Sequence, residues 1–524
     1  MDERNMSVRD YVEKYGYLKR GEKLSETREE DEIVLAGRIM SKRRSGKRLV
    51  FYEIKQYFQD VQIMCDMKDY RVREQDWNSE IKSLESEFEF YHSKLKKGDI
   101  IAVRGYPYRT KTGELTLAGR RVKLLAPCLH DFPEYGGIQN KEIRYRHRYV
   151  DLMVTPGVRN TFVARACIVG ALRRYLDQRG FIEVETPILS QTAGGACARP
   201  FETVMRAQDA SLYLRIAPEL YLKQLVVGGM DRVYEIGKSF RNEGIDYTHN
   251  PEFTTCEFYE AYADYEKLFS TVQELFLSIV CHMNSTLRLN RASQFGTSPA
   301  EAPTHDEDSV VLVDVPAKGT HPPLERVRID FRQPFKRVSV VEELERILKI
   351  RLPDVNDPKN SAFYRDVLKQ CNLDCPPPQT TVRMFDRLIE HFIESQCVQP
   401  TYLCHFPTSM SPLAREHRTR PALAERFELF IARMELANAY TEMNSPFEQA
   451  KRLKNQVPDG ESVKSDEEWF VRSLEWGLPP TAGCGLGIDR LVMLLTNKLS
   501  IKEVLLFPFM KDANANNEGK CQER

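Results

Sequence analysis

The chain has 524 residues, 42% of them hydrophobic, and a mean hydropathy of −0.47. These values are typical of a globular protein with two or three domains, and they exclude a bundle of membrane helices, because no run approaches the ~18 apolar residues that such a helix needs. Acidic and basic residues balance at 76 each, so any contact with nucleic acid must depend on local clusters of positive charge.

The first segment, residues 1–32, is polar and mixed in charge, apart from a short apolar-periodic piece around Tyr11 and Tyr15. It lacks the apolar run of a signal peptide, which favours a cytoplasmic protein. We therefore interpret residues 1–32 as an N-terminal extension of the folded protein.

Residues 33–126 have the element order of a small β-barrel. Three β-like runs, a helix-compatible stretch and two or more further β-like runs follow one another: 33–39, 49–54, 61–65, 80–97, 99–105, 115–117 and 122–125. This order is typical of a five-stranded OB-type barrel, a fold that binds single-stranded nucleic acid. Because neighbouring side chains on a strand alternate, only one of Phe51 and Tyr52 can face the barrel core.

Two clusters of basic residues in this region are candidates for phosphate contacts, with solvated loops as the alternative. The first is the run Lys42, Arg43, Arg44, Lys47 and Arg48, and the second contains Arg104, Arg109, Lys111, Arg120 and Arg121.

After a linker rich in proline, glycine and charge, residues 127–160, the pattern becomes helical. Apolar residues from Ala164 to Tyr175 recur at three and four positions, which predicts an amphipathic helix that ends near Gly180. A glycine at that place suits a left-handed C-terminal cap. The next run, residues 181–187, predicts a strand ended by Pro187.

Residues 232–259 predict two strands joined by a long polar loop. Alternation groups Glu235, Gly237 and Arg241 on one face of the first strand. On the second strand it groups four residues: Phe253, Thr255, Glu257 and Tyr259. Charged groups on an otherwise apolar strand pair are costly unless they line a site or form satisfied ion pairs, and both interpretations stay open here.

A second polar face is expected in residues 426–443, where alternation groups Asn438, Tyr440 and Glu442. Strict alternation does not place Glu435 on that face, so we expect a bulge or strand break between residues 435 and 438. Glu428 and Glu435 are candidate oxygen ligands for Mg²⁺.

Residues 482–490 predict a strand, alternate glycines and the start of a helix. Glycines at alternate positions remove side chains from one strand face, so that a flat ligand can lie on the backbone. The spacing differs from the Gly-x-Gly-x-x-Gly fingerprint, which excludes a dinucleotide-binding fold.

Two segments are expected to be poorly ordered. Residues 290–323 form a polar, proline-rich insertion with one strand-like run at 309–315, and residues 511–524 form a disordered tail.

Twelve cysteines include no Cys-x-x-Cys pair. The one loose cluster, Cys371, Cys375, Cys397 and Cys404 with His405, lacks the ligand spacing of structural zinc sites. We expect reduced, mostly buried thiols, and a zinc site at this cluster is the alternative.

Three of these segments, in order, resemble the signature motifs of class II aminoacyl-tRNA synthetases: 180–187, 240–258 and 483–490. Four runs are similar to the lysyl enzymes of the eukaryotic and bacterial type, in subclass IIb: 215–221, 240–246, 438–442 and 501–508. The resemblance covers residues 10–510, apart from the insertion. It implies an α+β protein, in which a five-stranded OB-fold barrel at 33–126 binds the anticodon. The catalytic domain at 161–510 would hold an antiparallel sheet flanked by helices.

The resemblance also implies an activity and partners. A lysine–tRNA ligase activates L-lysine with ATP to lysyl-adenylate and transfers it to the 3′-terminal adenosine of tRNA(Lys), with Mg²⁺ as cofactor. Enzymes with this first motif are usually homodimers. The alternatives are an aspartyl- or asparaginyl-type synthetase and a catalytically silent RNA-binding relative. Glu257 and Glu442 disfavour the first, because an aspartate side chain needs a cation, and the intact Arg241 and Arg490 disfavour the second.

Roles for individual residues carry over from the same resemblance. The catalytic arginines would be Arg241 and Arg490. The ATP contacts would be Arg241, Glu243, His249, Asn250, Phe253, Glu435 and Arg490, with Phe253 stacking on adenine. The lysine pocket would contain Gly195, Glu219, Glu257, Tyr259, Asn438, Tyr440, Glu442 and Gly487. Glu219 would accept the α-ammonium. Glu428 and Glu435 match the magnesium ligands, and Phe51, Gln62 and Glu114 match the anticodon-reading residues. Cys197 and Cys484 depart from the larger or aliphatic residues that the family often shows.

Overall fold

The computed structural model divides the chain into two compact units, residues 1–139 with 153–156 and residues 140–152 with 157–524. It describes residues 6–24, 32–57, 59–71, 84–134, 136–192, 194–195, 198–295, 308–316, 324–454 and 468–510, with the backbone alone for 287–295. Cys197, the predicted tail at 511–524 and residues 296–307 and 317–323 of the predicted insertion lie outside the described residues.

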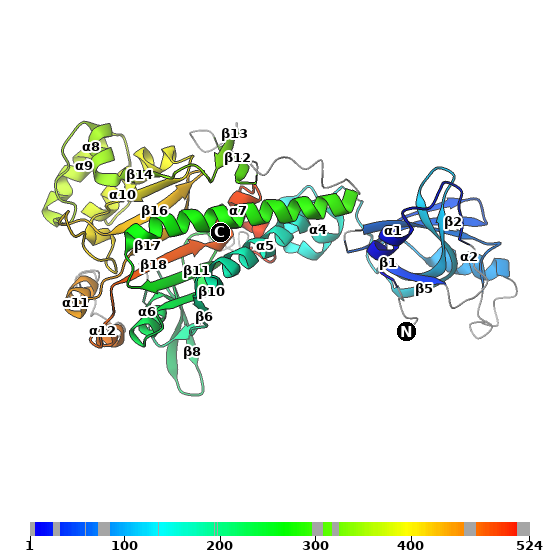
Figure 1. Ribbon diagram of the computed structural model, residues 1–524, viewed down its shortest axis with the longest axis horizontal. Helices are drawn as coiled ribbons and strands as arrows, with labels where there is room; N and C mark the ends of the chain where they lie inside the picture. The colour runs from blue at the N-terminus through cyan, green and yellow to red at the C-terminus, as the bar shows by residue number, and fades with distance from the viewer. Residues whose placement is uncertain are drawn as a thin grey trace, which may run out of the picture. The chain divides into compact units, whose positions relative to one another are not determined.

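The first unit is built around a closed five-stranded barrel, which confirms the predicted architecture (Figure 1). In pairing order its strands are β1 (Ile33–Ser45), β2 (Leu49–Gln56), β3 (Gln59–Asp66), β5 (Leu115–Ala126) and β4 (Ile100–Arg109), with helix α2 (Leu84–Lys94) between β3 and β4 in sequence. The two predicted runs at 115–117 and 122–125 form one strand, because the β4–β5 ladder continues across a register shift after Arg104.

The barrel core contains Tyr52 and excludes Phe51, as alternation predicts. Tyr52 is 1% exposed and its hydroxyl lies 2.7 Å from Nδ1 of His92 on α2. Phe51 lies on the outer face, where the guanidinium of Arg43 is 4.9 Å from the centre of its ring. Helix α1 (Val8–Tyr15) packs on the barrel, and the Tyr11 hydroxyl donates to the Thr116 carbonyl at 2.8 Å.

The second unit contains an eight-stranded sheet in the order β14-β15-β16-β17-β18-β11-β10-β6 (Figure 1). The bounds are β14 (Lys336–Ser339), β15 (Thr401–Cys404), β16 (Arg426–Ile431), β17 (Met434–Thr441), β18 (Thr481–Gly487), β11 (Glu252–Ala261), β10 (Arg232–Phe240) and β6 (Ile182–Glu183). Neighbouring strands are antiparallel except in the pairs β14–β15 and β10–β6. The strand predicted at 181–187 is reduced to β6, since only two of its residues pair with β10.

Two small sheets accompany the large one. β7 (Leu189–Ser190), β9 (Ala210–Leu214) and β8 (Phe201–Met205) form one, and β12 (Val310–Pro316) and β13 (Leu324–Asp330) form the other. The predicted strand-like run at 309–315 therefore corresponds to β12.

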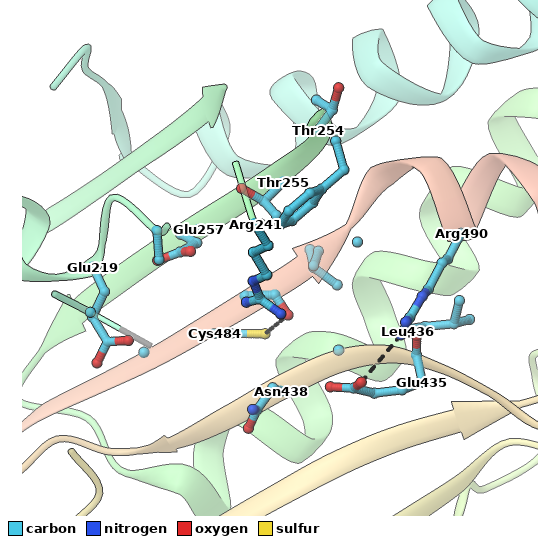
Figure 2. Close-up of a pocket in the computed structure, with 18 of the residues that line it drawn as sticks. Glu219, Arg241, Thr254, Thr255, Glu257, Glu435, Leu436, Asn438, Cys484 and Arg490 are labelled. Atoms are coloured by element: carbon cyan, nitrogen blue, oxygen red, sulfur yellow. Dashed lines mark hydrogen bonds and ion pairs between the residues drawn. The ribbon is translucent and has the colours of Figure 1, made fainter. Parts of the chain in front are cut away.

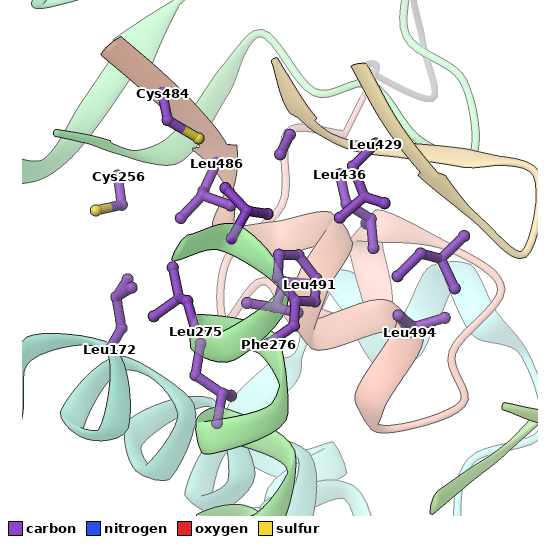
Figure 3. Packing of buried hydrophobic residues seen from close by; sticks show 14 of the residues in the cluster. Leu172, Cys256, Leu275, Phe276, Leu429, Leu436, Cys484, Leu486, Leu491 and Leu494 are labelled. Atoms are coloured by element: carbon purple, nitrogen blue, oxygen red, sulfur yellow. The ribbon is translucent and has the colours of Figure 1, made fainter. Parts of the chain in front are cut away.

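Two long helices, α5 (Val158–Asp177) and α7 (Tyr265–Phe295), run side by side against the sheet (Figure 1). Their apolar faces and those of β11, β17 and β18 bury the main core, with Leu172, Phe276 and Leu486 at 0%, 0% and 1% exposure (Figure 3). The helix predicted from Ala164 to Tyr175 is confirmed within α5, and Gly180 has the expected left-handed backbone, with φ +76°. Helix α7 continues to Phe295, so the predicted loop does not begin at residue 290.

The remaining helices connect and cover these layers. They are α3 (Lys141–Arg146), α4 (Arg148–Val154), α6 (Glu219–Val227), α8 (Val340–Leu348), α9 (Ser361–Gln370), α10 (Thr381–Phe392), α11 (Pro446–Lys454), α12 (Glu468–Leu474), α13 (Ile488–Leu495) and α14 (Ile501–Val504), with 3₁₀ turns at Pro358–Asn360, Glu394–Gln396 and Thr408–Met410. Within the described part of the chain, every helix is too short or too polar to cross a membrane.

Candidate active site

A cavity of about 430 Å³ opens over β11, β18 and β17, a size typical of small-molecule sites (Figure 2). Fourteen of the residues proposed from the sequence line it: Gly195, Glu219, Arg241, Glu243, His249, Asn250, Phe253, Glu257, Tyr259, Glu435, Asn438, Tyr440, Gly487 and Arg490. Glu428 and Glu442 do not line it but lie on or next to the strands that do. Glu219 and Glu257 lie at one end of the cavity, Glu435 and Arg490 at the other, and Arg241 extends between them (Figure 2).

The floor of the cavity is a row of glycines in the central strand. Gly485 pairs with Glu257 on one side and Asn438 on the other, and Gly483 pairs in the same way with Tyr259 and Tyr440. The side chains that line the cavity here come from the neighbouring strands β11 and β17, and the glycines of β18 leave open space between them. A Cβ at Gly483 would lie 2.1 Å from Oε1 of Glu442 and 2.5 Å from Cε1 of Tyr259, so a larger residue there would displace both groups.

Acidic groups gather at one end of this floor. Glu219 begins α6, and its Oε1 accepts hydrogen bonds from the Tyr440 hydroxyl and the Lys223 ammonium, both at 2.6 Å. Lys223 is 0% exposed and also contacts Glu442. Among the described residues, Oε1 of Glu442 has no hydrogen-bond partner.

Glu257 completes the acidic group from β11. It accepts a hydrogen bond from the Tyr259 hydroxyl at 3.1 Å. Burial and the negative charge of Glu219 raise the pKa of Glu257 to about 8, although Tyr259 and Arg241 oppose the shift. A carboxyl group in that state gains most from a ligand that brings positive charge, because the cation favours its ionised form.

Two side chains that line the cavity, Arg241 and Asn250, present unused hydrogen-bonding groups. The Arg241 guanidinium lies 5.2 Å from the centre of the Phe253 ring, and its Nε is buried with no partner among the described residues. Asn250 donates from Nδ2 to the Glu252 carbonyl at 2.7 Å, whereas its Oδ1 is likewise buried and unpartnered in the described part of the chain. Buried polar atoms of this kind are expensive without a partner, which indicates that a polar ligand completes them.

The opposite end is held by a chain of ion pairs and hydrogen bonds. Arg490 contacts Oε2 of Glu435 at 3.2 Å, and its Nη2 lies 2.9 Å from Nε2 of His249. Since an arginine only donates, Nε2 of His249 must accept, and the proton on Nδ1 then points to Asp246 at 2.7 Å. These contacts fix the orientation of the His249 ring.

Asp489, a residue that the sequence analysis passed over, connects this end to the core. It is 2% exposed, its Oδ2 accepts from the Thr254 backbone N–H at 2.7 Å, and its Oδ1 contacts Arg165 of α5 at 2.6 Å. One carboxylate therefore fixes β11, α13 and α5 relative to one another and positions the neighbouring Arg490.

The proposed magnesium ligands come from adjacent strands. The predicted irregularity exists, because the β16–β17 register skips Leu436 between Glu435 and Ala437. Burial raises the pKa of Glu428 to about 7; Arg426 opposes the shift, and the charge of Glu435 adds to it. Two carboxylates that repel each other suit a cation whose other ligands are phosphate oxygens and water. Each also has an arginine partner, Arg426 for Glu428 and Arg490 for Glu435.

The alternative zinc site has no support in the described residues, where no three or more His, Cys, Asp or Glu side chains are arranged so that they could hold a metal ion. The cysteines that the structure describes are free thiols, as expected.

Glu235 forms a satisfied ion pair, which is one of the two interpretations that the sequence left open for the charged groups of this strand pair. It is 4% exposed, pairs with Arg215 at 2.6 Å and accepts from the Thr186 hydroxyl at 2.6 Å. It lies opposite Glu257 in the β10–β11 ladder but does not line the cavity. Gly237 is required beside this pair, because a Cβ there would lie 2.2 Å from Nη2 of Arg215.

The sequence analysis did not identify two cationic residues at the site, Lys223 and Arg426. For each of them, the spacing in the sequence could have indicated the contact. Lys223 follows Glu219 by four positions on a helix, a spacing that brings side chains together. Arg426 alternates with Glu428 on β16, and its Nε donates to Oδ1 of Asn438 at 3.1 Å. Cys484, noted as a departure, lines the cavity and is 1% exposed.

In the barrel, the three residues proposed to read the anticodon lie on adjacent strands or in the turn next to them. Phe51 and Gln62 lie on the adjacent strands β2 and β3. Gln62 donates to the hydroxyl of Thr116 at 2.9 Å, and the exposed Glu114 lies two residues before it in the turn leading to β5.

Comparison with known proteins assigns both units. Residues 140–511 match the family model described as tRNA synthetases class II (D, K and N), and residues 33–125 match that of the OB-fold nucleic acid binding domain. The chain is 42% identical to lysine–tRNA ligase cla4 of Cladosporium cladosporioides, over 98% of this chain and 81% of that protein. It is 45% identical to a probable cytoplasmic lysine–tRNA ligase of Enterocytozoon bieneusi, over 80% of this chain and 77% of that protein. With the lysine–tRNA ligase of Aquifex aeolicus it shares 40% identity, over 93% of this chain and 74% of that protein.

Proposed function

The chain belongs to the class II tRNA synthetases of the D, K and N group, and we propose that it is the enzyme that joins lysine to the 3′-terminal adenosine of tRNA(Lys), using ATP. The observation that carries the choice of lysine is the convergence of Glu219 and Glu257 at one end of the cavity with Glu442, which lies next to Gly483 of the cavity floor.

A charge count supports this choice. Three carboxylates and one cation, Lys223, meet at that end, so the group carries two negative charges in excess when all are ionised. Free lysine brings two ammonium groups to neutralise them, and its carboxylate extends toward Arg241. An aspartate or asparagine side chain would leave these carboxylates unpaired, which costs far more than a small misfit.

The chemistry needs no general base for the first step. The lysine carboxylate, ionised at neutral pH, attacks the α-phosphorus of ATP; a new P–O bond forms and pyrophosphate leaves. Arg241, whose Nε lacks a partner among the described residues, supplies positive charge where negative charge develops, and Arg490 and His249 hold the nucleotide end. Mg²⁺ held by Glu428 and Glu435 would neutralise phosphate charge.

In the second step, a hydroxyl of the terminal adenosine attacks the carbonyl of lysyl-adenylate and AMP leaves. The barrel would bind the anticodon through Phe51, Gln62 and Glu114. The cytoplasm is the proposed compartment, in line with the Enterocytozoon bieneusi relative, which is named cytoplasmic.

The test is ATP–pyrophosphate exchange with lysine, aspartate or asparagine, followed by charging of tRNA. We expect exchange with lysine alone. Exchange with aspartate or asparagine would assign the chain to its sister enzymes, and no exchange with any of the three would favour a silent RNA-binding relative.

Lysine affinity is expected to depend on pH through Glu257. With a pKa of about 8 in the empty site, Glu257 is mostly protonated at pH 6–7, and it must lose its proton when an ammonium binds. The Kd for lysine should therefore fall as pH rises from 6 to 8, by up to about tenfold per pH unit at the lower end. Calorimetry at pH 7 in buffers of different ionisation enthalpy should detect a released proton. A Kd that is flat over this range, or unaltered pH dependence in Glu257→Gln, would contradict this role.

A homodimer is also part of the proposal. Apolar side chains are exposed along the edge strand β6 and the small sheet beside it: Ile182 52%, Ile188 44%, Leu189 49%, Val204 57% and Met205 40%. Exposed apolar side chains on and near a sheet edge are typical of an interface.

Sedimentation at micromolar concentration should therefore give a dimer, and Leu189→Asp should give a monomer. The matched control is Leu312→Asp on β12, at a side chain that is also 49% exposed, which should remain dimeric. A monomeric wild type would exclude the dimer.

A further inference from the structure

Lys223 is buried beside the pocket, and the reaction as proposed makes no use of it. It lies on α6, one turn after Glu219, and does not line the cavity. Its ammonium is 2.6 Å from Glu219 and in contact with Glu442, whereas all three side chains are nearly inaccessible, at 0%, 8% and 1%. Burying an ammonium is unfavourable unless carboxylates surround it, and breaking such a group leaves an uncompensated charge.

Glu219 and Glu442 each contact the Lys223 ammonium through only one of their two carboxylate oxygens. Glu219 accepts from Lys223 and Tyr440 through Oε1, and its Oε2 forms no hydrogen bond or ion pair with the described residues. Glu442 meets Lys223 through Oε2, and its Oε1 lies close to where a Cβ of Gly483 would be, beside the Tyr259 ring. Both Gly483 and Tyr259 line the cavity. Each carboxylate thus has one oxygen committed to Lys223 and one left toward the substrate.

The charge of Lys223 matters because the surroundings are acidic. Burial lowers the pKa of Lys223, but Glu219 and Glu442 outweigh burial and raise it, so the ammonium stays charged. Burial raises the pKa of Glu442 well above its ordinary value; Lys223 opposes this rise, and the charges of Glu219 and Glu257 add to it. Removing Lys223 would raise the pKa of Glu442 further and weaken its charge-assisted hold on an ammonium.

We propose that Lys223 is a positioning residue for recognition of the substrate: its ammonium bridges Glu219 and Glu442 and orients both carboxylates toward the two ammonium groups of lysine. The inference rests on the proposed function. Lys223 acts through the two glutamates and does not touch the substrate.

The test is Lys223→Met, which keeps the length of the side chain and removes its charge. In ATP–pyrophosphate exchange we expect the KM for lysine to rise at least about tenfold, with the KM for ATP within about twofold of wild type. In a Glu442→Gln background the share of the effect that runs through Glu442 is already lost and only the share carried by Glu219 remains, so the same change should raise the lysine KM less than about threefold further. Equal rises in both backgrounds, or an unchanged lysine KM in the single variant, would overturn the inference.

The double variant keeps the inference testable if Lys223→Met alone does not fold. Removing both partners leaves no unpaired charge between positions 223 and 442, which is tolerated better than removing one. If Lys223→Met does not fold, the comparison of the double variant with Glu442→Gln decides: a lysine KM within about threefold supports the inference, and a larger rise refutes it.

A matched control is Lys267→Met. Lys267, which is half-exposed, pairs at 2.7 Å with the buried Glu260 outside the cavity, and its loss should leave the lysine KM unchanged. Wild-type protein measured alongside separates the two claims. No lysine-dependent exchange by wild type would reject the proposed function, whereas an active wild type with an unaltered Lys223→Met variant would reject only the role of Lys223.

Discussion

Replacing Arg241 by alanine is expected to lower kcat for lysine-dependent ATP–pyrophosphate exchange by ~10²–10³, the usual cost of removing one preorganised donor from developing charge. The fold should persist, because Nε of Arg241 has no hydrogen-bond partner among the described residues and so contributes little to folding. Circular dichroism and thermal unfolding would check this point. Arg241→Lys should recover only part of the rate, since an ammonium lacks the planar fork of a guanidinium.

The matched control is Arg232→Ala. Arg232 begins the strand that leads to Arg241, and it pairs with Glu260 at 2.9 Å outside the cavity. Its loss should leave exchange within about twofold of wild type. Normal exchange by Arg241→Ala would show that Arg241 takes no part in the reaction, and the unpartnered Nε of Arg241 would then have no explanation.

Replacing Glu442 by glutamine is expected to raise the KM for lysine at least about tenfold, since a charge-assisted contact contributes ~1.5–3 kcal/mol. The structure adds a second reason. Glu442 is also the partner of the buried Lys223, so the neutral amide both weakens the substrate contact and leaves the Lys223 ammonium with Glu219 alone. The KM for ATP should change little, because Glu435 and Arg490, which we propose contact the nucleotide, lie at the other end of the cavity (Figure 2).

The control is Glu260→Gln on β11, where a buried glutamate pairs with Arg232 and Lys267 away from the cavity. This change should alter stability and leave the lysine KM as in wild type. An unchanged lysine KM in Glu442→Gln would remove Glu442 from the pocket, and an equal rise in both variants would point to a general loss of packing.

The periodicity of the sequence determined which side chains share a strand face. Alternation grouped Glu257 with Tyr259, and Asn438 with Tyr440 and Glu442, and it required the bulge that the β16–β17 register shows near Leu436. Alternate glycines likewise indicated a floor without side chains, which Gly483 and Gly485 form. These features are local, since a strand repeats every two residues whatever its neighbours are.

The same alternation could not separate two buried acids of the strand pair. Glu235 and Glu257 face each other in the β10–β11 ladder, and both are glutamates on strands rich in apolar residues. Arg215 reaches Glu235 and forms a structural ion pair with it, whereas Glu257 forms no ion pair with any described residue and opens to the cavity. The distinction depends on where Arg215 lies after folding, and periodicity carries no information about that.

The sequence by itself determined the order of the barrel elements and the residues on each polar face, because these follow from local spacing, whereas the fold of the catalytic domain was implied by the resemblance to class II synthetases. Only the tertiary structure decided which faces meet. Strand β18 inserts between β11 and β17, which are distant in the chain, and this places Glu257 and Asn438 across one glycine. Lys223 reaches Glu442 for the same reason: the contact belongs to the packing of α6 against the sheet, and non-local packing of this kind has no period in the sequence.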